Sequence, residues 1–187
     1  MKRHFYALAA SAALLGLTAL PAAAQNFIIS SSLPQAHLWT GGHMVDFMEI
    51  LEKSSDGAVT FTPFFAGELT GVGRELDALQ GGAVHIAAPL LAPYHEGAFP
   101  LSDVTQLPTY GTDSPMVTRS FQKLLDSDEV LKDGKTFYQY EIEPKGIRVW
   151  AVGATSAYSL STASKSLEAP ADFQGMPLRA GSAIHTL

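Results

Sequence analysis

The chain of 187 residues contains no cysteine. This absence excludes disulfide bonds, thiolate metal sites, redox-active cysteine pairs and a cysteine nucleophile. Basic residues are also scarce, because 12 lysines and arginines stand against 18 acidic residues and give a formal charge of −6 at pH 7. A chain of this charge repels a phosphate backbone, which argues against nucleic acid as a partner.

Apolar residues, in contrast, are abundant. They make up 47% of the chain, whereas charged residues make up 16%. This composition provides enough material for a hydrophobic core and differs from that of disordered proteins. Because domains commonly contain about 100–150 residues, the length allows one domain, or one domain and part of another.

The amino-terminal segment has the three parts of a secretory signal peptide. Lys2 and Arg3 are cationic, residues 5–20 form an apolar run, and alanines at 22–24 supply small residues for cleavage. The run is shorter than the roughly 20 residues that a membrane-spanning helix needs. We therefore expect residues 1–24 to be a signal peptide that directs the chain to the periplasm, and we expect the mature protein not to span the membrane.

Strand and helix patterns alternate beyond this segment. Strands are expected at residues 27–30, 59–65, 83–88, 147–152, 158–162 and 176–180. Helices are expected at residues 37–54, 72–80, 114–125 and 128–141, with a single turn at 170–175 and a last helix from Ser182. This alternation predicts an α/β fold with a mostly parallel sheet and ligand contacts at the carboxyl ends of its strands.

Local features add detail to this prediction. Pro63 interrupts the second strand, which predicts that the strand lies near a sheet edge or ends early. On the helix predicted at 72–80, Glu75 falls on the polar face. Ser114 is expected to cap the next helix, with Pro115 at its first position. Charged residues become sparse near Val152, and we place a domain boundary there.

No motif in the sequence indicates catalysis. Gly71 and Gly73 supply half of a dinucleotide-binding fingerprint, but Leu76 replaces its third glycine. We interpret these residues as a turn whose backbone amides could hold an anion at the start of a helix. No nucleophile elbow or spaced pair of catalytic carboxylates can be recognised. We therefore expect no enzymatic activity and no cofactor.

Metal binding is not predicted either. The sequence after Asp126 begins like a calcium loop, yet Leu131 stands at the glycine position and Phe137 at the position of the bidentate glutamate. Five histidines lack the spacing of zinc sites: His37, His43, His85, His95 and His185.

Two segments resemble a known family. Residues 64–87 combine an aromatic pair, a Gly-x-Leu turn, a helix with an Arg-Glu pair and a Gln-x-Gly ending, and an apolar strand. Residues 167–179 are similar to an "x-Asp-x-x-Gly-x-x-x-Arg" segment. Together with the signal peptide, these patterns resemble the DctP family, the solute-binding proteins of tripartite ATP-independent periplasmic (TRAP) transporters.

This resemblance implies a fold and a function. The fold is a periplasmic-binding-protein-like pair of α/β domains that closes around a small organic acid. The function is that of a periplasmic receptor that delivers the acid to the transporter's membrane permease. Family members are nearly twice as long, so the chain looks truncated, with a first domain at 25–152 and the beginning of a second at 153–187.

The resemblance also implies a set of ligand-binding residues. The arginine of the second pattern binds the ligand's carboxylate in the family, and it maps onto Arg179. A guanidinium presents a planar fork of donors that meets a carboxylate in bidentate fashion. Further contacts are implied after the first strand, at His37 and Trp39, after the third strand, at Tyr94, and at the start of the second domain, at Tyr158.

Two alternatives remain open from the sequence. Besides the receptor, the chain could be a periplasmic ligand-binding sensor module. It could also be a truncated fragment without function. A sensor would need a membrane anchor, for which the sequence gives no sign.

The signal peptide gives a first prediction. The exported protein should begin at Gln25, because cleavage follows small residues, and loss of Lys2 and Arg3 leaves 10 basic against 18 acidic residues, a charge of −8. Intact-mass spectrometry of the periplasmic fraction gives the mass of the exported protein and so identifies its first residue. An Ala24→Arg variant should accumulate as the uncleaved precursor, and a periplasmic protein that keeps Met1 would contradict the assignment.

Overall fold

The computed structural model describes residues 24–106, 113–151, 153–155, 161–163, 166–177 and 179. Almost all of the predicted signal peptide lies outside these residues. So do most of the strand predicted at 158–162 and the helix predicted from Ser182.

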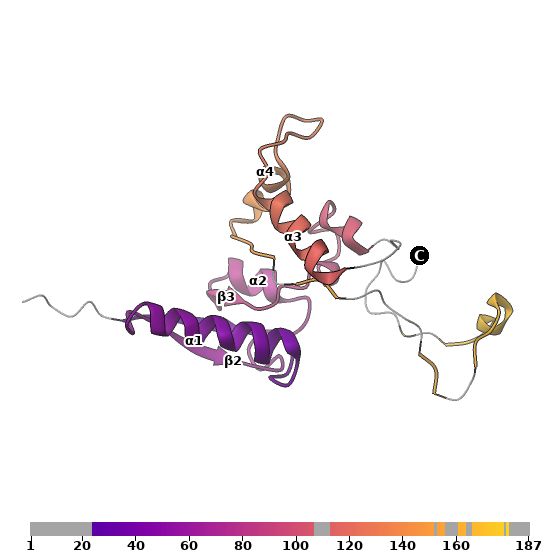
Figure 1. Ribbon diagram of the computed structural model, residues 1–187, viewed down its shortest axis with the longest axis horizontal. Helices are drawn as coiled ribbons and strands as arrows, with labels where there is room; N and C mark the ends of the chain where they lie inside the picture. The colour runs from indigo at the N-terminus through magenta and orange to yellow at the C-terminus, as the bar shows by residue number, and fades with distance from the viewer. Residues whose placement is uncertain are drawn as a thin grey trace, which may run out of the picture.

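A three-stranded parallel sheet organises the amino-terminal part (Figure 1). Its strands are β1 (Gln25–Ser30), β2 (Val59–Phe64) and β3 (Ile86–Ala87), in the order β2-β1-β3. The predicted parallel sheet is thus confirmed, and β2 lies at an edge, as Pro63 indicates. Because the strands run the same way, their carboxyl ends meet at one edge of the sheet.

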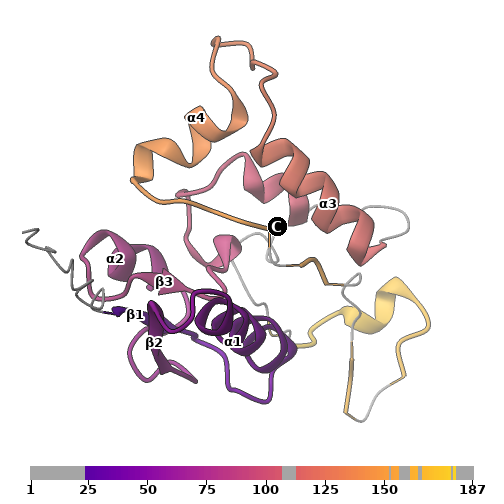
Figure 2. The same ribbon diagram turned by 60° about the vertical axis from the view of Figure 1, so that its left-hand side comes forward.

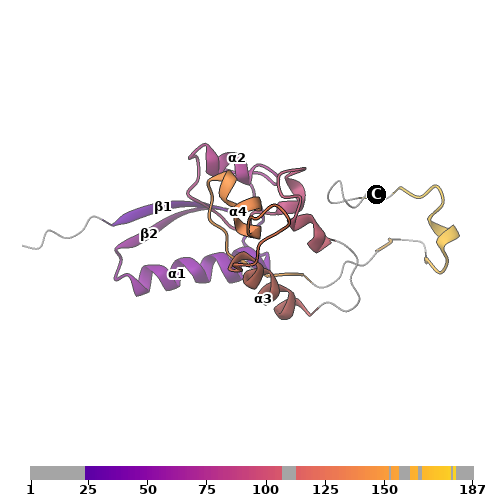
Figure 3. The same cartoon turned by 90° about the horizontal axis from the view of Figure 1, so that it is seen from above.

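Helices cover both faces of this sheet (Figure 3). On one face lies α1 (Val45–Ser54), preceded by the π-helical turn η1 (Leu38–Met44), and on the other lies α2 (Glu75–Gln80). The helix predicted at 37–54 therefore has two parts. The core under α1 consists of Ile29, Met44 and Met48, with Phe61 and Ile86 packed against them.

A second helical group lies beside the sheet (Figure 2). It contains α3 (Ser114–Leu125) and α4 (Phe137–Glu141), with the short turns η2 (Ala92–Tyr94), η3 (Ser102–Gln106) and η4 (Glu143–Lys145) nearby. Its core includes Leu76 from α2, so the sheet layer and this group share apolar contacts. The buried members are Leu76, Phe99, Leu125, Phe137 and Ile142.

The helix predicted at 128–141 is wrong for most of its length. Val130 and Thr136 pair as an isolated antiparallel bridge across a turn, and α4 begins only after Thr136. The hydroxyl of Thr136 accepts the Gln139 N–H at 3.2 Å, and the Gln139 side chain accepts the Thr136 N–H at 3.0 Å. This capping box fixes the start of the helix.

Other predicted elements are also corrected. Residues 147–151 form no strand, because the N–H of Ala151 donates to the Gln122 side chain at 2.9 Å instead of a neighbouring strand. Residues 176 and 177 are not in a strand. The cap of α3 is Asp113, whose Oδ1 accepts the Met116 N–H at 3.0 Å, so Ser114 is the first helical residue. The predicted turn at 170–175 is present as η5 (Pro170–Phe173).

Each helix in the described part of the chain is too short or too polar to cross a bilayer.

The second core gives a stability prediction. Phe137 is 4% exposed, and its ring meets that of Phe121 edge-on, with 5.9 Å between the centroids. A Phe137→Ala variant should lose about 3–5 kcal/mol of unfolding free energy through lost burial and a cavity. Urea unfolding followed by circular dichroism measures the loss. Tyr140→Ala on the same helix, where the side chain is 44% exposed, is the control, and equal losses would contradict the burial of Phe137.

Candidate functional site

The carboxylate of Glu75 has three polar contacts beyond the carboxyl edge of the sheet. Its side chain is fully buried. Oε1 accepts the Ser32 hydroxyl at 2.8 Å, Oε2 accepts the Gly73 N–H at 2.8 Å, and Nε2 of His95 lies 2.9 Å from Oε2. Ser32 follows β1, Gly73 precedes α2, and His95 follows η2, so one carboxylate joins three separate segments.

The surroundings of Glu75 favour its ionised form. Burial raises the pKa of this carboxyl, but hydrogen bonds from His95, its own backbone N–H and Ser32 together hold the pKa below its ordinary value of 4.5. The side chain is therefore an anion at neutral pH. Its expected place on the exposed polar face of the helix is wrong, because these partners, distant in sequence, draw it into the interior.

The turn at Gly71 and Gly73 has a different role from the one predicted. The N–H of Gly73 already donates to the protein's own carboxylate at Glu75. Gly73 has a φ of +77°, and a Cβ there would lie 2.8 Å from the carbonyl oxygen of Tyr94. Only glycine fits both conditions, so the turn packs directly against η2.

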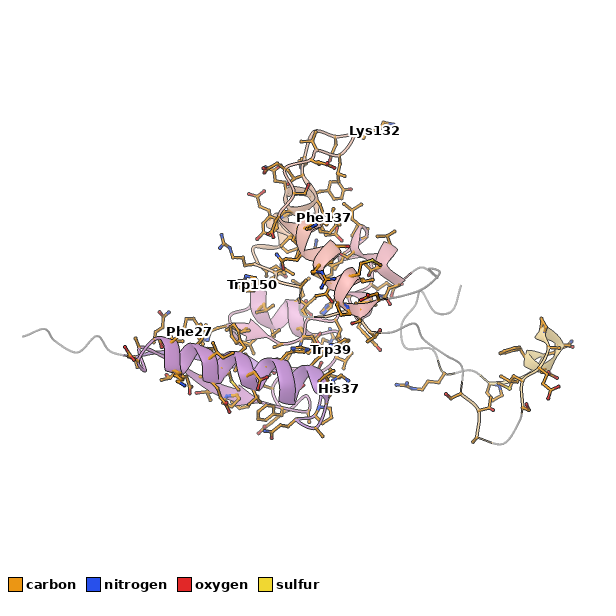
Figure 4. The ribbon with its side chains drawn as sticks, in the orientation of Figure 1. Phe27, His37, Trp39, Lys132, Phe137 and Trp150 are labelled. Carbon is orange, nitrogen blue, oxygen red and sulfur yellow. The ribbon has the colours of Figure 1, made fainter. Side chains whose placement is uncertain are left out.

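Two predicted ligand-binding residues lie together at the end of β1. Nδ1 of His37 accepts the Trp39 N–H at 3.2 Å, and their ring centroids are 5.3 Å apart. Figure 4 places both at the end of the sheet opposite Phe27, which is near the start of β1. Thr40, next in sequence, lies with its Oγ1 2.8 Å from the hydroxyl oxygen of Ser31, which fixes η1 to the end of β1.

Trp39 also approaches the position where the domain boundary is predicted. Gly153 has a φ of +127°, and a Cβ on it would lie 3.4 Å from Nε1 of the Trp39 indole. A side chain at this position would therefore be strained in its backbone and crowded by the indole. Tyr94, the third predicted residue of the first domain, is 40% exposed on η2.

Two further residues are predicted to bind the ligand, Tyr158 and Arg179. Tyr158 lies outside the described residues. Arg179 is exposed and forms no ion pair within the part of the chain that the structure describes. It follows η5, which lies apart from the sheet in each view (Figures 1–3).

The aspartate of the second family-like pattern holds its own turn. Oδ2 of Asp172 accepts the N–H groups of Glu168 and Ala169, both at 2.9 Å. These two hydrogen bonds lower the pKa of Asp172. The aspartate thus stabilises η5. Asp172 lies four residues after Glu168 and seven residues before Arg179.

A separate cavity lies away from His37 and Trp39. It has a volume of about 260 Å³ and lies beside Trp150, whose position Figure 4 marks. Its lining residues are Gln122, Asp126, Tyr138, Arg148, Val149 and Trp150. Arg148, which falls in the strand predicted at 147–152, is exposed here. Among the described side chains, no three of the types that bind metals come together.

Comparison with known proteins defines the family. The profile of the bacterial extracellular solute-binding protein family 7, DctP, matches residues 29–186. The chain belongs to this family. The match includes both segments in which the resemblance was recognised, and the family is one of solute-binding proteins and not of enzymes. Among curated proteins no relative matches.

The chain is also similar to solved structures. A TRAP periplasmic solute-binding protein from Desulfovibrio salexigens, an open complex, is 24% identical with a TM-score of 0.52, over 56% of this chain and 32% of that one. A TRAP solute-binding protein from Rhodoferax ferrireducens, in complex with copurified benzoate, is 23% identical with a TM-score of 0.49, over 55% and 32%. The chain thus spans about a third of these proteins, and the likeness to the first shows a partial periplasmic-binding-protein-like α/β fold.

The ionised state of Glu75 gives a prediction on pH. Because its folded-state pKa lies below 4.5, Glu75 contributes its full stability above that pH, and this contribution is lost as pH falls through the folded-state pKa. A Glu75→Gln variant should lose about 1.5–3 kcal/mol of unfolding free energy at neutral pH, as expected when hydrogen bonds to a buried charged group are weakened. The difference from the parent protein should shrink in acid.

Urea titrations at several pH values measure this difference. Asp77→Asn is the matched control on the same helix, because that side chain is 70% exposed and lies 3.5 Å from Arg74. An exposed pair of this kind contributes about 0–1 kcal/mol. A Glu75→Gln effect that is the same at all pH values would contradict an ionised Glu75.

Proposed function

We propose that the protein is the periplasmic solute-binding receptor of a TRAP transporter, which captures a small organic acid by its carboxylate and delivers it to the membrane permease. The observation that carries this proposal is the family match over residues 29–186. The signal-peptide pattern of residues 1–24 supports a periplasmic location.

The family resemblance implies an organic acid as the ligand, and the charge of the chain indicates how the acid would be attracted. With a mature charge of −8, the protein cannot attract an anion by its overall field, so the attraction has to be local. Arg179 is exposed and has no ion pair within the described residues, so its guanidinium is available to a carboxylate. A guanidinium binds a carboxylate through two parallel hydrogen bonds.

The binding site lies between two domains in this proposal. Residues 25–152 form the first domain, whose sheet edge supplies His37, Trp39 and Tyr94. Residues 153–187 begin the second domain, which supplies Tyr158 and Arg179. Ligands of parallel α/β sheets bind outside the carboxyl ends of the strands, where His37 and Trp39 lie together. Gly153, where a Cβ would lie 3.4 Å from Nε1 of Trp39, is the first residue of the second domain in this proposal.

Paired probes test the ligand class. Thermal-shift assays compare carboxylates with their uncharged amides, such as benzoate with benzamide and succinate with succinamide. The proposal expects at least one carboxylate to raise the melting temperature while its amide does not, because the amide lacks the charge that the guanidinium recognises. Equal shifts with both members of each pair, or none across the carboxylates, would contradict it.

Substitution of Arg179 gives the corresponding residue-level prediction. Arg179→Lys should weaken binding of the carboxylate that gives the largest shift by about tenfold or more, because a point charge replaces a bidentate fork. Isothermal titration calorimetry measures the affinity. Arg119→Lys, an exposed position on α3, is the matched control. Unchanged affinity in the Arg179→Lys variant would remove this residue from the site.

A further inference from the structure

We propose that Glu75 is a positioning residue of the candidate binding site, which sets the place of Tyr94 through His95. This inference rests on the proposed function, because Tyr94 is assigned to ligand binding there. Glu75 itself is fully buried and does not reach a ligand.

The chain of contacts runs from the sheet edge to η2. The Glu75 carboxylate is fixed on one side by the Ser32 hydroxyl and the Gly73 N–H, both at 2.8 Å. On its other side Nε2 of His95 lies 2.9 Å away, with the His95 side chain 5% exposed. The imidazole is also held edge-on against Phe99, with 6.0 Å between ring centroids. His95 is therefore fixed from two directions.

The backbone of Tyr94 lies between Gly73 and His95. Its carbonyl oxygen faces Gly73, where a Cβ would come within 2.8 Å, and the next residue in sequence is the fixed His95. Its N–H donates to the Leu91 carbonyl at 2.9 Å. The backbone of Tyr94 is thus held on both sides, while its side chain is 40% exposed. Rigid support of this kind lowers the entropy cost of binding.

The ionised carboxylate accepts the Ser32 hydroxyl on one oxygen and the Gly73 N–H on the other, and Nε2 of His95 lies 2.9 Å from the second oxygen. Glutamine at this position keeps one acceptor oxygen, which can face Gly73 and His95 only if the amide NH2 turns to the Ser32 hydroxyl, and it loses the negative charge beside His95. The neighbouring charged groups, Arg74 before α2 and Asp77 on it, do not replace it. Arg74 and Asp77 contact each other at 3.5 Å, and their side chains are 77% and 70% exposed. Loss of the Glu75 charge should therefore release His95 and loosen η2.

Hydrogen exchange followed by mass spectrometry tests this role in the whole protein at neutral pH. In Glu75→Gln, the amides of Tyr94, His95 and Ala98 should exchange about tenfold faster than in the parent, because local opening costs less free energy. Peptides from β1 and β2 should change less. Asp77→Asn should leave the exchange of all these peptides unchanged.

A double-mutant cycle of Glu75→Gln with His95→Gln tests whether Glu75 acts on Tyr94 through His95. His95→Gln alone should also accelerate exchange at Tyr94, and the double variant should be no faster than the single ones, because both remove the same contact. Equal acceleration in every peptide of Glu75→Gln, no acceleration at Tyr94, or additive effects in the double variant would each overturn the positioning role. If no carboxylate stabilises the protein more than its amide does, the proposed function is contradicted. The hydrogen-exchange result does not depend on that outcome.

Discussion

The buried carboxylate of Glu75 constrains the geometry of the carboxyl edge of the sheet. A charge removed from water is tolerated only where donors surround it, and here the hydroxyl of Ser32, the N–H of Gly73 and the imidazole of His95 converge on it. These groups belong to three segments that are far apart in the sequence. The position of each segment therefore depends on the other two.

The sheet provides the frame for this convergence. Since β1 is central and parallel to both neighbours, the segments after all three strands leave on one side of the molecule. The Ser31–Thr40 contact then fixes η1 at the same edge, which brings Trp39 beside Gly153. Backbone topology brings these segments to one edge, and buried polar contacts fix their detailed positions.

The sequence allowed prediction of the elements whose signals are local. Strand β1, edge strand β2 and helix α3 were predictable because alternation, a proline and an apolar stripe are properties of neighbouring residues. The short α4 was not, because the helical pattern of residues 128–141 continues across Thr136, whose capping box starts the helix. Residues 147–151 look like a strand by composition, yet the N–H of Ala151 is taken by a side chain on α3.

The candidate site was predictable only in part for the same reason. His37, Trp39 and Tyr94 follow strands in the sequence, so their general location follows from the order of elements. The burial of Glu75 does not, because its hydrogen-bond partner Ser32 is 43 residues away, and periodicity within a helix places a carboxylate on the solvent side. The glutamate of the family's Arg-Glu pair, directly after a glycine turn, was the signal that could have indicated it.

The central position of β1 has a consequence for the kinetics of folding. Contacts of β1 with β2 join residues 34 apart in sequence, and those with the β3 segment join residues 57 apart. Each requires closure of a long loop before any pairing energy is gained, which slows the formation of parallel sheets. The first strand to leave a ribosome or a translocation pore therefore keeps one edge unpaired until residue 64 has followed it and the other until residue 87 has followed it. An unpaired strand edge exposes the chain to aggregation during that interval.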